Sequence, residues 1–203
     1  MGGLNYVEFQ RCARVGLEQA RASLSAFTGR DLELGSVDMA FVDLRTVPLL
    51  SGDPESVVLA SYVSFRGDAE GQLMMLFRPD TAEKVAAFLT PEVFQDLRQE
   101  EIPQLLESLL PEVANVVGSS LLNAIADGAG FKLVPTPPIM VRDMAGAVLG
   151  SAMTYTGVSD TVYVVHIKFT LSGGKATFEI VFLPKVSSDL DKFLGDRVGQ
   201  CKT

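Results

Sequence analysis

The sequence predicts an α+β protein in which two long helices pack on a mostly antiparallel sheet. Residues 5–27 and 101–127 carry apolar side chains at helical spacing. Extended runs at 57–65 and 72–77 are separated by turn residues, as in a β-hairpin. This order of elements occurs twice along the chain, which predicts an internally duplicated helix-sheet-helix unit with pseudo-two-fold symmetry.

The first half begins with an amphipathic helix over 5–27. Its apolar residues are Val7, Cys12, Val15, Ala20, Leu24 and Phe27, and Thr28, Gly29 and Arg30 end it. The pattern is then strand-like over 32–50 and continues into the hairpin. Beyond the hairpin the spacing predicts a helix over 81–89 that begins near Pro79 or Asp80, followed by a charged connector over 91–100.

The second half repeats this order. Helix 101–127 leads into a strand around 132–141 and a short apolar segment at 143–153. Two further strands are expected at 161–171 and 176–183, with a final helix at 187–195.

Matching residues support the duplication. Leu32 and Met39 match Leu133 and Met140 at an offset of 101, and at an offset of 105 Phe77, Pro79, Phe88 and Leu89 match Phe182, Pro184, Phe193 and Leu194. We therefore expect a single domain over 1–203 with pseudo-repeats at about 5–90 and 101–196. Each half would cover the apolar face of the other, so neither should fold alone.

Composition excludes several classes of protein. The formal net charge of −8 argues against sequence-independent nucleic-acid binding, which needs a basic surface. Cys12 and Cys201 lie far apart and His166 is the only histidine, so neither a zinc site nor a disulfide framework is indicated. No signal peptide or membrane-spanning apolar run is apparent, and we expect a cytoplasmic protein.

The segment SLLPEVANVVGSS, residues 108–120, contains one row of small polar and acidic residues in an apolar background. Ser108, Glu112, Asn115 and Ser119 recur at spacings of four, three and four, which places them on one narrow stripe of a helix. Glu101 and Gln104 extend this stripe upstream. Because nearly all other residues here are apolar, we expect the stripe to be the helix's one solvent-facing side.

Glu112 and Asn115 are close enough on one helical face to act on the same small group. A glutamate can hold a cation and an asparagine can orient a water molecule, whereas neither is a good nucleophile. On spacing alone, an ordinary solvated helix face is the favoured explanation of the pair. Their chemistry therefore needs a second observation to support it.

That observation is a resemblance. Ser108, three residues, Glu112, two residues, Asn115, twenty-two residues and Pro138 is similar to the motif of the CheC, CheX and FliY family of chemotaxis phosphatases. The stretch ANVVGSSLLNAIADGAGFKLVPTPP resembles that family's second half, and the run from residue 43 to residue 77 resembles its first. The resemblance covers nearly the whole chain.

The resemblance implies a function. Such proteins dock on a phosphorylated receiver domain, typically a CheY-like response regulator, and speed hydrolysis of its aspartyl phosphate. Glu112 would pair with a lysine of the partner, Asn115 would position the attacking water, and Ser108 and Pro138 would shape the helix and the following strand. The chain would need no cofactor of its own, with Mg²⁺ expected in the partner receiver domain.

Two features leave alternatives open. Subtracting 101 from the motif positions gives Val7, Arg11, Arg14 and Val37, so the first half has lost the motif and Arg11 and Arg14 are interpreted as a solvated face stabilised by Glu18. Pro111 lies inside the motif and predicts a kink or a restart of the helix. The rival functions are a non-catalytic binding module or scaffold for a receiver domain, and a CheD-like receptor deamidase or its partner. A structural part of the flagellar switch is a third.

Overall fold

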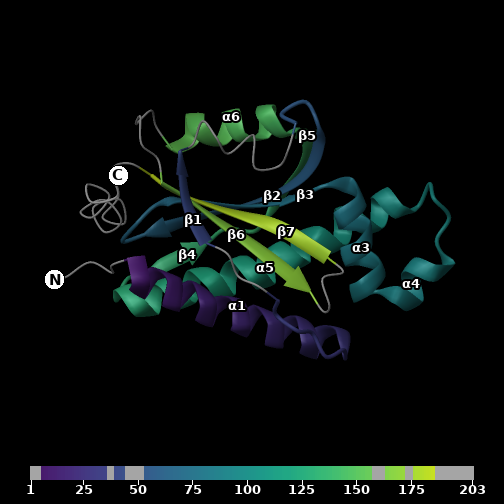
Figure 1. The fold of residues 1–203 in the computed structure, drawn as a ribbon, viewed down its shortest axis with the longest axis horizontal. Helices are drawn as coiled ribbons and strands as arrows, with labels where there is room; N and C mark the ends of the chain where they lie inside the picture. The colour runs from purple at the N-terminus through teal and green to yellow at the C-terminus, as the bar shows by residue number, and fades with distance from the viewer. Residues whose placement is uncertain (1–5, 36–38, 44–52, 157–162, 172–175, 186–203) are drawn as a thin grey trace.

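Two long helices, α1 (Tyr6–Thr28) and α5 (Ile102–Ala129), lie side by side on one face of the sheet (Figure 1). Helix α6 (Ala145–Thr156) covers the opposite face, and α3 (Pro79–Leu89) and α4 (Pro91–Asp96) lie beyond one end. The computed structural model describes residues 6–35, 39–43, 53–156, 163–171 and 176–185. The predicted α+β class, with long helices on an antiparallel sheet, is confirmed.

Seven strands form one sheet in which every described pair of neighbours is antiparallel. The path runs β1-β6-β7-β3-β2-β4, and β5 also pairs with β2, so β4 and β5 occupy successive lengths of one edge. The strands are β1 (Met39–Asp43), β2 (Val57–Gly67), β3 (Gly71–Phe77), β4 (Leu133–Pro135), β5 (Ile139–Met144), β6 (Tyr163–Leu171) and β7 (Ala176–Pro184).

Strands that correspond to each other under the expected repeat occupy mirrored positions in the sheet. From one edge the order of strands runs β1-β6-β7, and from the other β5-β2-β3. The offset of 101 carries β1 onto β5, and the offset of 105 carries β2 onto β6 and β3 onto β7. This arrangement is what a duplicated unit would produce, and the duplication itself stays a prediction.

Several predicted elements need correction. The connector at 91–100 contains helix α4, which Pro91 begins at the first helical position and Glu92 stabilises as an acidic residue in the first turn. The apolar segment at 143–153 consists of the last two residues of β5 and residues 145–153 of α6. The strand around 132–141 is divided into β4 and β5. Residues 44–50 and the final helix expected at 187–195 lie outside the described residues.

The buried face of α1 differs from the predicted one. Phe9, Ala13 and Leu17 are fully buried, and of the predicted apolar residues Cys12, Ala20 and Leu24 are buried with them. Val7 and Phe27 are each 70% exposed, and Val15 is 48% exposed. Val7 and Val15 point away from the shared face because their spacing places them elsewhere around the helix, whereas Phe27 has the angular position of Phe9 and is exposed in the last turn of the helix.

Helices α1 and α5 approach closely where α1 has a glycine. A Cβ atom added at Gly16 would lie 2.7 Å from the Cα of Leu121 and 2.8 Å from the carbonyl oxygen of Ser120. Both of these are backbone atoms, which a change of side-chain rotamer cannot move. The absence of a side chain at Gly16 therefore sets the spacing of the two helices.

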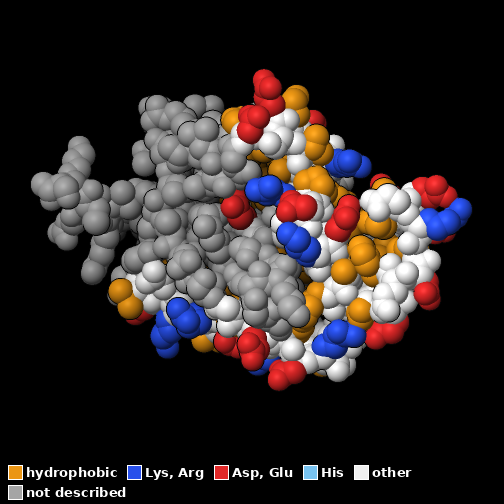
Figure 2. All heavy atoms as spheres, turned by 45° about the vertical axis from the view of Figure 1, so that its right-hand side comes forward, with side chains coloured by type: hydrophobic (Ala, Val, Ile, Leu, Met, Phe, Trp, Pro, Cys, Tyr) orange, Lys and Arg blue, Asp and Glu red, His pale blue; other side chains and the backbone are white. Residues whose placement is uncertain are grey.

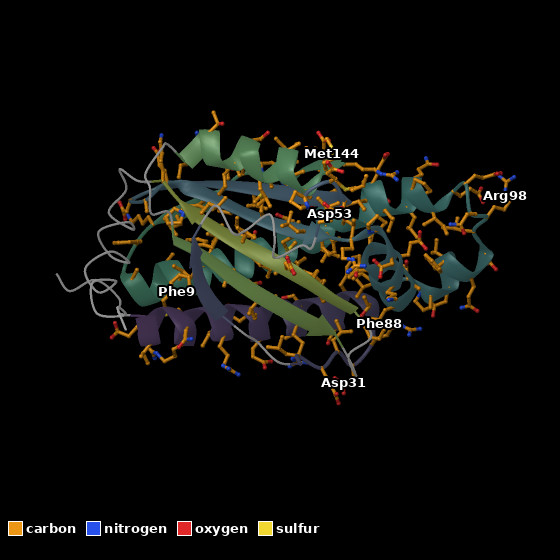
Figure 3. All side chains as sticks on the ribbon, turned by 45° about the horizontal axis from the view of Figure 1, so that its top comes forward. Phe9, Asp31, Asp53, Phe88, Arg98 and Met144 are labelled. Carbon is orange, nitrogen blue, oxygen red and sulfur yellow. The ribbon has the colours of Figure 1, made fainter. Side chains whose placement is uncertain are left out.

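The main core lies between these helices and the sheet. Phe9 lies between α1 and the sheet (Figure 3), with its ring centroid 5.7 Å from that of Phe182. Phe182 stacks in turn on Phe65 at 5.4 Å. By length and composition α5 could span a membrane, but most of its apolar side chains are buried in this core. The apolar character of α5 therefore serves the packing of the domain.

Candidate functional site

Helix α5 presents its polar stripe to solvent. Gln104, Ser108, Glu112 and Asn115 are exposed, and Ser119 is half-buried. Residues on the remaining sides, such as Leu110 and Val117, are fully buried. The prediction that this stripe is the solvent-facing side of an otherwise packed helix is confirmed for these residues, although Glu107 beside it is exposed as well.

The upstream end of the stripe is already occupied. The Glu101 carboxylate accepts hydrogen bonds from the Arg98 backbone N–H at 2.9 Å and from Arg98 Nε at 3.2 Å. These hydrogen bonds hold the pKa of the Glu101 carboxyl below its ordinary value. Glu101 therefore stabilises the start of α5. The part of the stripe that is not used in this way begins at Gln104.

The side chains of Glu112 and Asn115 differ from that of Glu101 in this respect. Among the described residues, neither side chain makes a hydrogen bond or an ion pair. Three residues of helix separate them by about 4.5 Å along the axis, so both groups face one small region of space. A carboxylate and an amide held on a well-packed helix form a preorganised pair that can hold a cation and orient a water molecule.

Pro111 does not interrupt α5, so the helix does not restart there, and a kink at Pro111 stays a prediction. The helix is continuous from Ile102 to Ala129 with Pro111 inside it. The missing donor of Pro111 leaves the carbonyl of Glu107 without its helical partner, and because Glu107 is exposed, water can satisfy that oxygen. Burial of α5 on the other sides maintains the helix across this gap.

Ser108 consequently keeps its phase with Glu112 and Asn115. Its hydroxyl donates to the carbonyl oxygen of Leu105 at 2.9 Å, one turn back on the same helix. With its donor used within the helix, Ser108 is suited to shaping the turn before Pro111. No chemistry is required of it.

Pro138 lies directly before β5, on the strand edge next to the stripe. Gly118 of α5 rests on Val63 of β2, since a Cβ added at Gly118 would lie 3.3 Å from Val63 Cγ2. The register pairs Ile139 with Tyr62, which brings Pro138 to the level of Val63 and hence to the helical turn that holds Asn115. Pro138 therefore lies one strand away from the contact between α5 and the sheet.

Arg11 and Arg14 of α1 are both exposed, as expected for a solvated face. The expected support from Glu18 is not found, because Glu18 Oε2 accepts instead from Arg21 Nε at 2.8 Å. On a helix, a glutamate and an arginine can form an ion pair when they are three residues apart as well as when they are four apart. The two arginines thus leave α1 without an acidic counterpart of Glu112.

We expect reversal of charge at both Arg11 and Arg14 to leave the activity of the α5 stripe nearly unchanged. The positive pair lies on the other helix and has no group that can orient a water molecule. The measurement is the activity of the Arg11→Glu, Arg14→Glu variant beside that of Asn115→Ala, with folding followed by circular dichroism. A well-folded double variant as inactive as Asn115→Ala would show that the wrong helix was chosen.

Sequence reasoning missed a group of charged residues beside the stripe. Glu83 of α3, Glu107 of α5 and Arg142 of β5 surround a small apolar pocket near the start of α5. They lie far apart in the sequence, so no local spacing could have revealed them. Within the described ranges, no three His, Cys, Asp or Glu side chains are placed to hold a metal ion.

Comparison with solved structures places this fold among known ones. The chain is similar to FliY of Thermotoga maritima, with a TM-score of 0.65 and 14% identity, over 94% of this chain and 95% of FliY. It is similar to CheX in the CheX-CheY-BeF3-Mg²⁺ complex of Borrelia burgdorferi, with a TM-score of 0.53 and 19% identity, over 85% and 97% of the two chains.

A third similarity widens the range of functions that this fold carries. The middle domain of FliM from Vibrio alginolyticus matches with a TM-score of 0.59 and 11% identity, over 92% of this chain and 99% of that domain. No family model matches the sequence. At these identities the comparisons establish the fold, and the argument for a function depends on the residues of the site.

Proposed function

We propose that this chain, which has the fold of the CheC, CheX and FliY proteins, is a phosphatase for the aspartyl phosphate of a receiver domain. The observation that carries the proposal is the exposed pair Glu112 and Asn115, three residues apart on the most deeply packed helix and without partners among the described residues. A chemotaxis partner is supported by CheX of Borrelia burgdorferi, which was solved together with CheY.

Hydrolysis of an aspartyl phosphate requires few catalytic groups from the phosphatase. An acyl phosphate is intrinsically reactive, and Mg²⁺ bound in the receiver supplies neutralisation of phosphoryl charge. What remains is a nucleophile held in line with the scissile bond. The Asn115 amide oxygen can accept a hydrogen bond from a water molecule while its NH₂ group donates to the phosphoryl oxygens, and an amide does not itself compete as a nucleophile.

Glu112 has a different role in this proposal. Its carboxylate lies about one helical turn before Asn115 and would pair with a lysine of the receiver, so that Asn115 enters the receiver's site in one register. The chain as a whole carries a net charge of −8, which favours a basic group on the partner. Ser108 and Pro138 would support the pair by shaping α5 and the start of β5.

The test is decay of a phosphorylated CheY-like receiver with and without this chain. We expect the chain to accelerate loss of the phosphoryl group, with saturation as its concentration rises. If saturating protein binds the receiver and leaves the decay rate unchanged, the chain is a binding module or scaffold. If it neither binds a receiver nor changes the decay rate, both the phosphatase and the binding-module hypotheses are wrong.

We expect Glu112→Ala to raise the half-saturating concentration in this assay while the plateau rate changes little. Loss of one charge-assisted contact at a partly exposed interface costs roughly 1 to 3 kcal/mol. Asp127→Ala is the matched control, since it removes one acidic charge from an exposed position in the last turn of the same helix. A large fall in plateau rate with unchanged half-saturation would assign Glu112 to the chemical step instead.

A further inference from the structure

A small apolar pocket lies beside the stripe, where α3, α5 and β5 meet. Its walls are mainly Leu59, Ile102, Pro103, Leu106 and Met140, and Glu83, Glu107 and Arg142 stand around it. On this side of the molecule, hydrophobic side chains are gathered among acidic and basic ones (Figure 2). Its volume is about 100 Å³.

This volume decides what the pocket can hold. Pockets for drug-sized ligands have volumes of about 300–1,000 Å³. A water molecule takes about 30 Å³ of liquid, so the pocket has room for a few heavy atoms. One aliphatic side chain of a protein partner fits this space, and a metabolite of ordinary size does not.

The surrounding charges are unused within this chain. Among the described residues, Glu83, Glu107 and Arg142 make no ion pair or hydrogen bond through their side chains. Glu107 and Arg142 are exposed, and Glu83 is half-buried. Two carboxylates against one guanidinium leave the rim acidic, which favours a basic group on the partner and disfavours an acidic one.

The pocket lies upstream of the Glu112 and Asn115 pair and shares α5 with it. Glu107 precedes Asn115 by eight residues, which is about 12 Å along the helix axis and about 80° around it. Met140 and Arg142 line the pocket from β5, the strand that follows Pro138. A standard interface covers about 800 Å² per partner, a patch roughly 30 Å across. One docked domain would therefore cover both the pair and the pocket.

We propose that this pocket takes one apolar side chain of the receiver domain, next to a lysine or arginine that pairs with Glu83 and Glu107. The inference rests on the proposed function and adds a second anchor to it. An anchor about 12 Å from Asn115 fixes the angle at which the receiver meets α5, which a single contact at Glu112 cannot do. The pocket residues are positioning residues and take no part in the chemical step.

The first test truncates the pocket wall. Met140→Ala should raise the half-saturating receiver concentration by about fivefold or more, as for truncation of an anchor position, and leave the plateau rate unchanged. Met144→Ala is the matched control, because it makes the same change near the far end of β5, where Met144 is 47% exposed (Figure 3). Thermal unfolding of both variants checks that the fold is kept.

The second test reverses the rim charge. Glu83→Lys combined with Glu107→Lys should weaken receiver binding by about tenfold or more at low salt, with a smaller effect at high salt. The control is Glu70→Lys, at an exposed position where β3 begins, where the carboxylate pairs with Lys185. Binding is measured directly by titration of the receiver, so this result does not depend on phosphatase activity.

The outcomes separate the two proposals. If Asn115→Ala abolishes acceleration but the pocket variants bind the receiver as the wild-type chain does, the pocket proposal is overturned and the phosphatase stands. If the wild-type chain fails to accelerate dephosphorylation while the pocket variants still lose receiver binding, the phosphatase fails and the docking pocket stands. A change in self-association with unchanged receiver affinity would identify a second copy as the occupant, and would overturn the proposal.

Discussion

Replacement of Asn115 by alanine should lower the plateau rate of receiver dephosphorylation by about 10²-fold or more, with little change in half-saturation. The amide is the group proposed to hold the attacking water in line, and loss of such positioning costs on the order of 10²-fold in rate. This corresponds to about 3 kcal/mol of barrier height. Because Asn115 is exposed and makes no hydrogen bond among the described residues, the substitution should not unfold the protein.

The control for this variant lies on the same helix. Asn123 is also exposed on α5, eight residues after Asn115 and four after Ser119, so Asn123→Ala removes the same amide from a position about 12 Å further along the helix axis. Its plateau rate should match that of the wild-type chain. If Asn115→Ala keeps the full plateau rate, water positioning by this side chain is wrong, and the binding-module function takes its place.

Replacement of Gly16 by alanine should lower the free energy of unfolding by about 2 to 3 kcal/mol. Alanine is the better helix former by about 1 kcal/mol, so helix propensity alone predicts the opposite sign. The added methyl group would meet the backbone of α5 at Leu121 and Ser120, at 2.7 and 2.8 Å, and the helices would have to separate. Urea unfolding monitored by circular dichroism measures the difference.

Gly150 provides the comparison that isolates packing. It lies within α6, is exposed, and a Cβ added there meets nothing within 4 Å. Gly150→Ala should therefore leave stability unchanged or raise it by up to about 1 kcal/mol. Equal effects of the two substitutions would mean that α1 and α5 can shift at no cost, and that Gly16 does not set their spacing.

Local periodicity was sufficient for much of the fold. The helices at 5–27 and 101–127 and the hairpin at 57–77 are patterns of neighbouring residues, and the structure has α1, α5, β2 and β3 there. The stripe on α5 was predictable for the same reason, because a spacing of three or four residues fixes a helical face. The identity of the apolar neighbours then indicated that this face would be exposed.

The errors lie where tertiary packing decides. An apolar residue such as Val15 looked like core from the sequence, but its position around α1 leaves it 48% exposed. Pro111 predicted a kink or a restart of α5, and burial of the surrounding turns keeps the helix continuous without a restart. The pocket formed with Glu83, Glu107 and Arg142 joins three elements distant in sequence, which no single-sequence pattern can bring together.

The position of β1 in the sheet has a consequence for the time at which this protein can fold during synthesis. In the described sheet β1 pairs with β6 alone, and its residue Asp43 is opposite Tyr163, 120 positions later. At about 5–20 residues per second, the ribosome needs roughly 6 to 24 s to deliver that partner. During this interval the nascent chain holds an unpaired strand edge, a template for pairing with another chain, which makes it a natural substrate for chaperones.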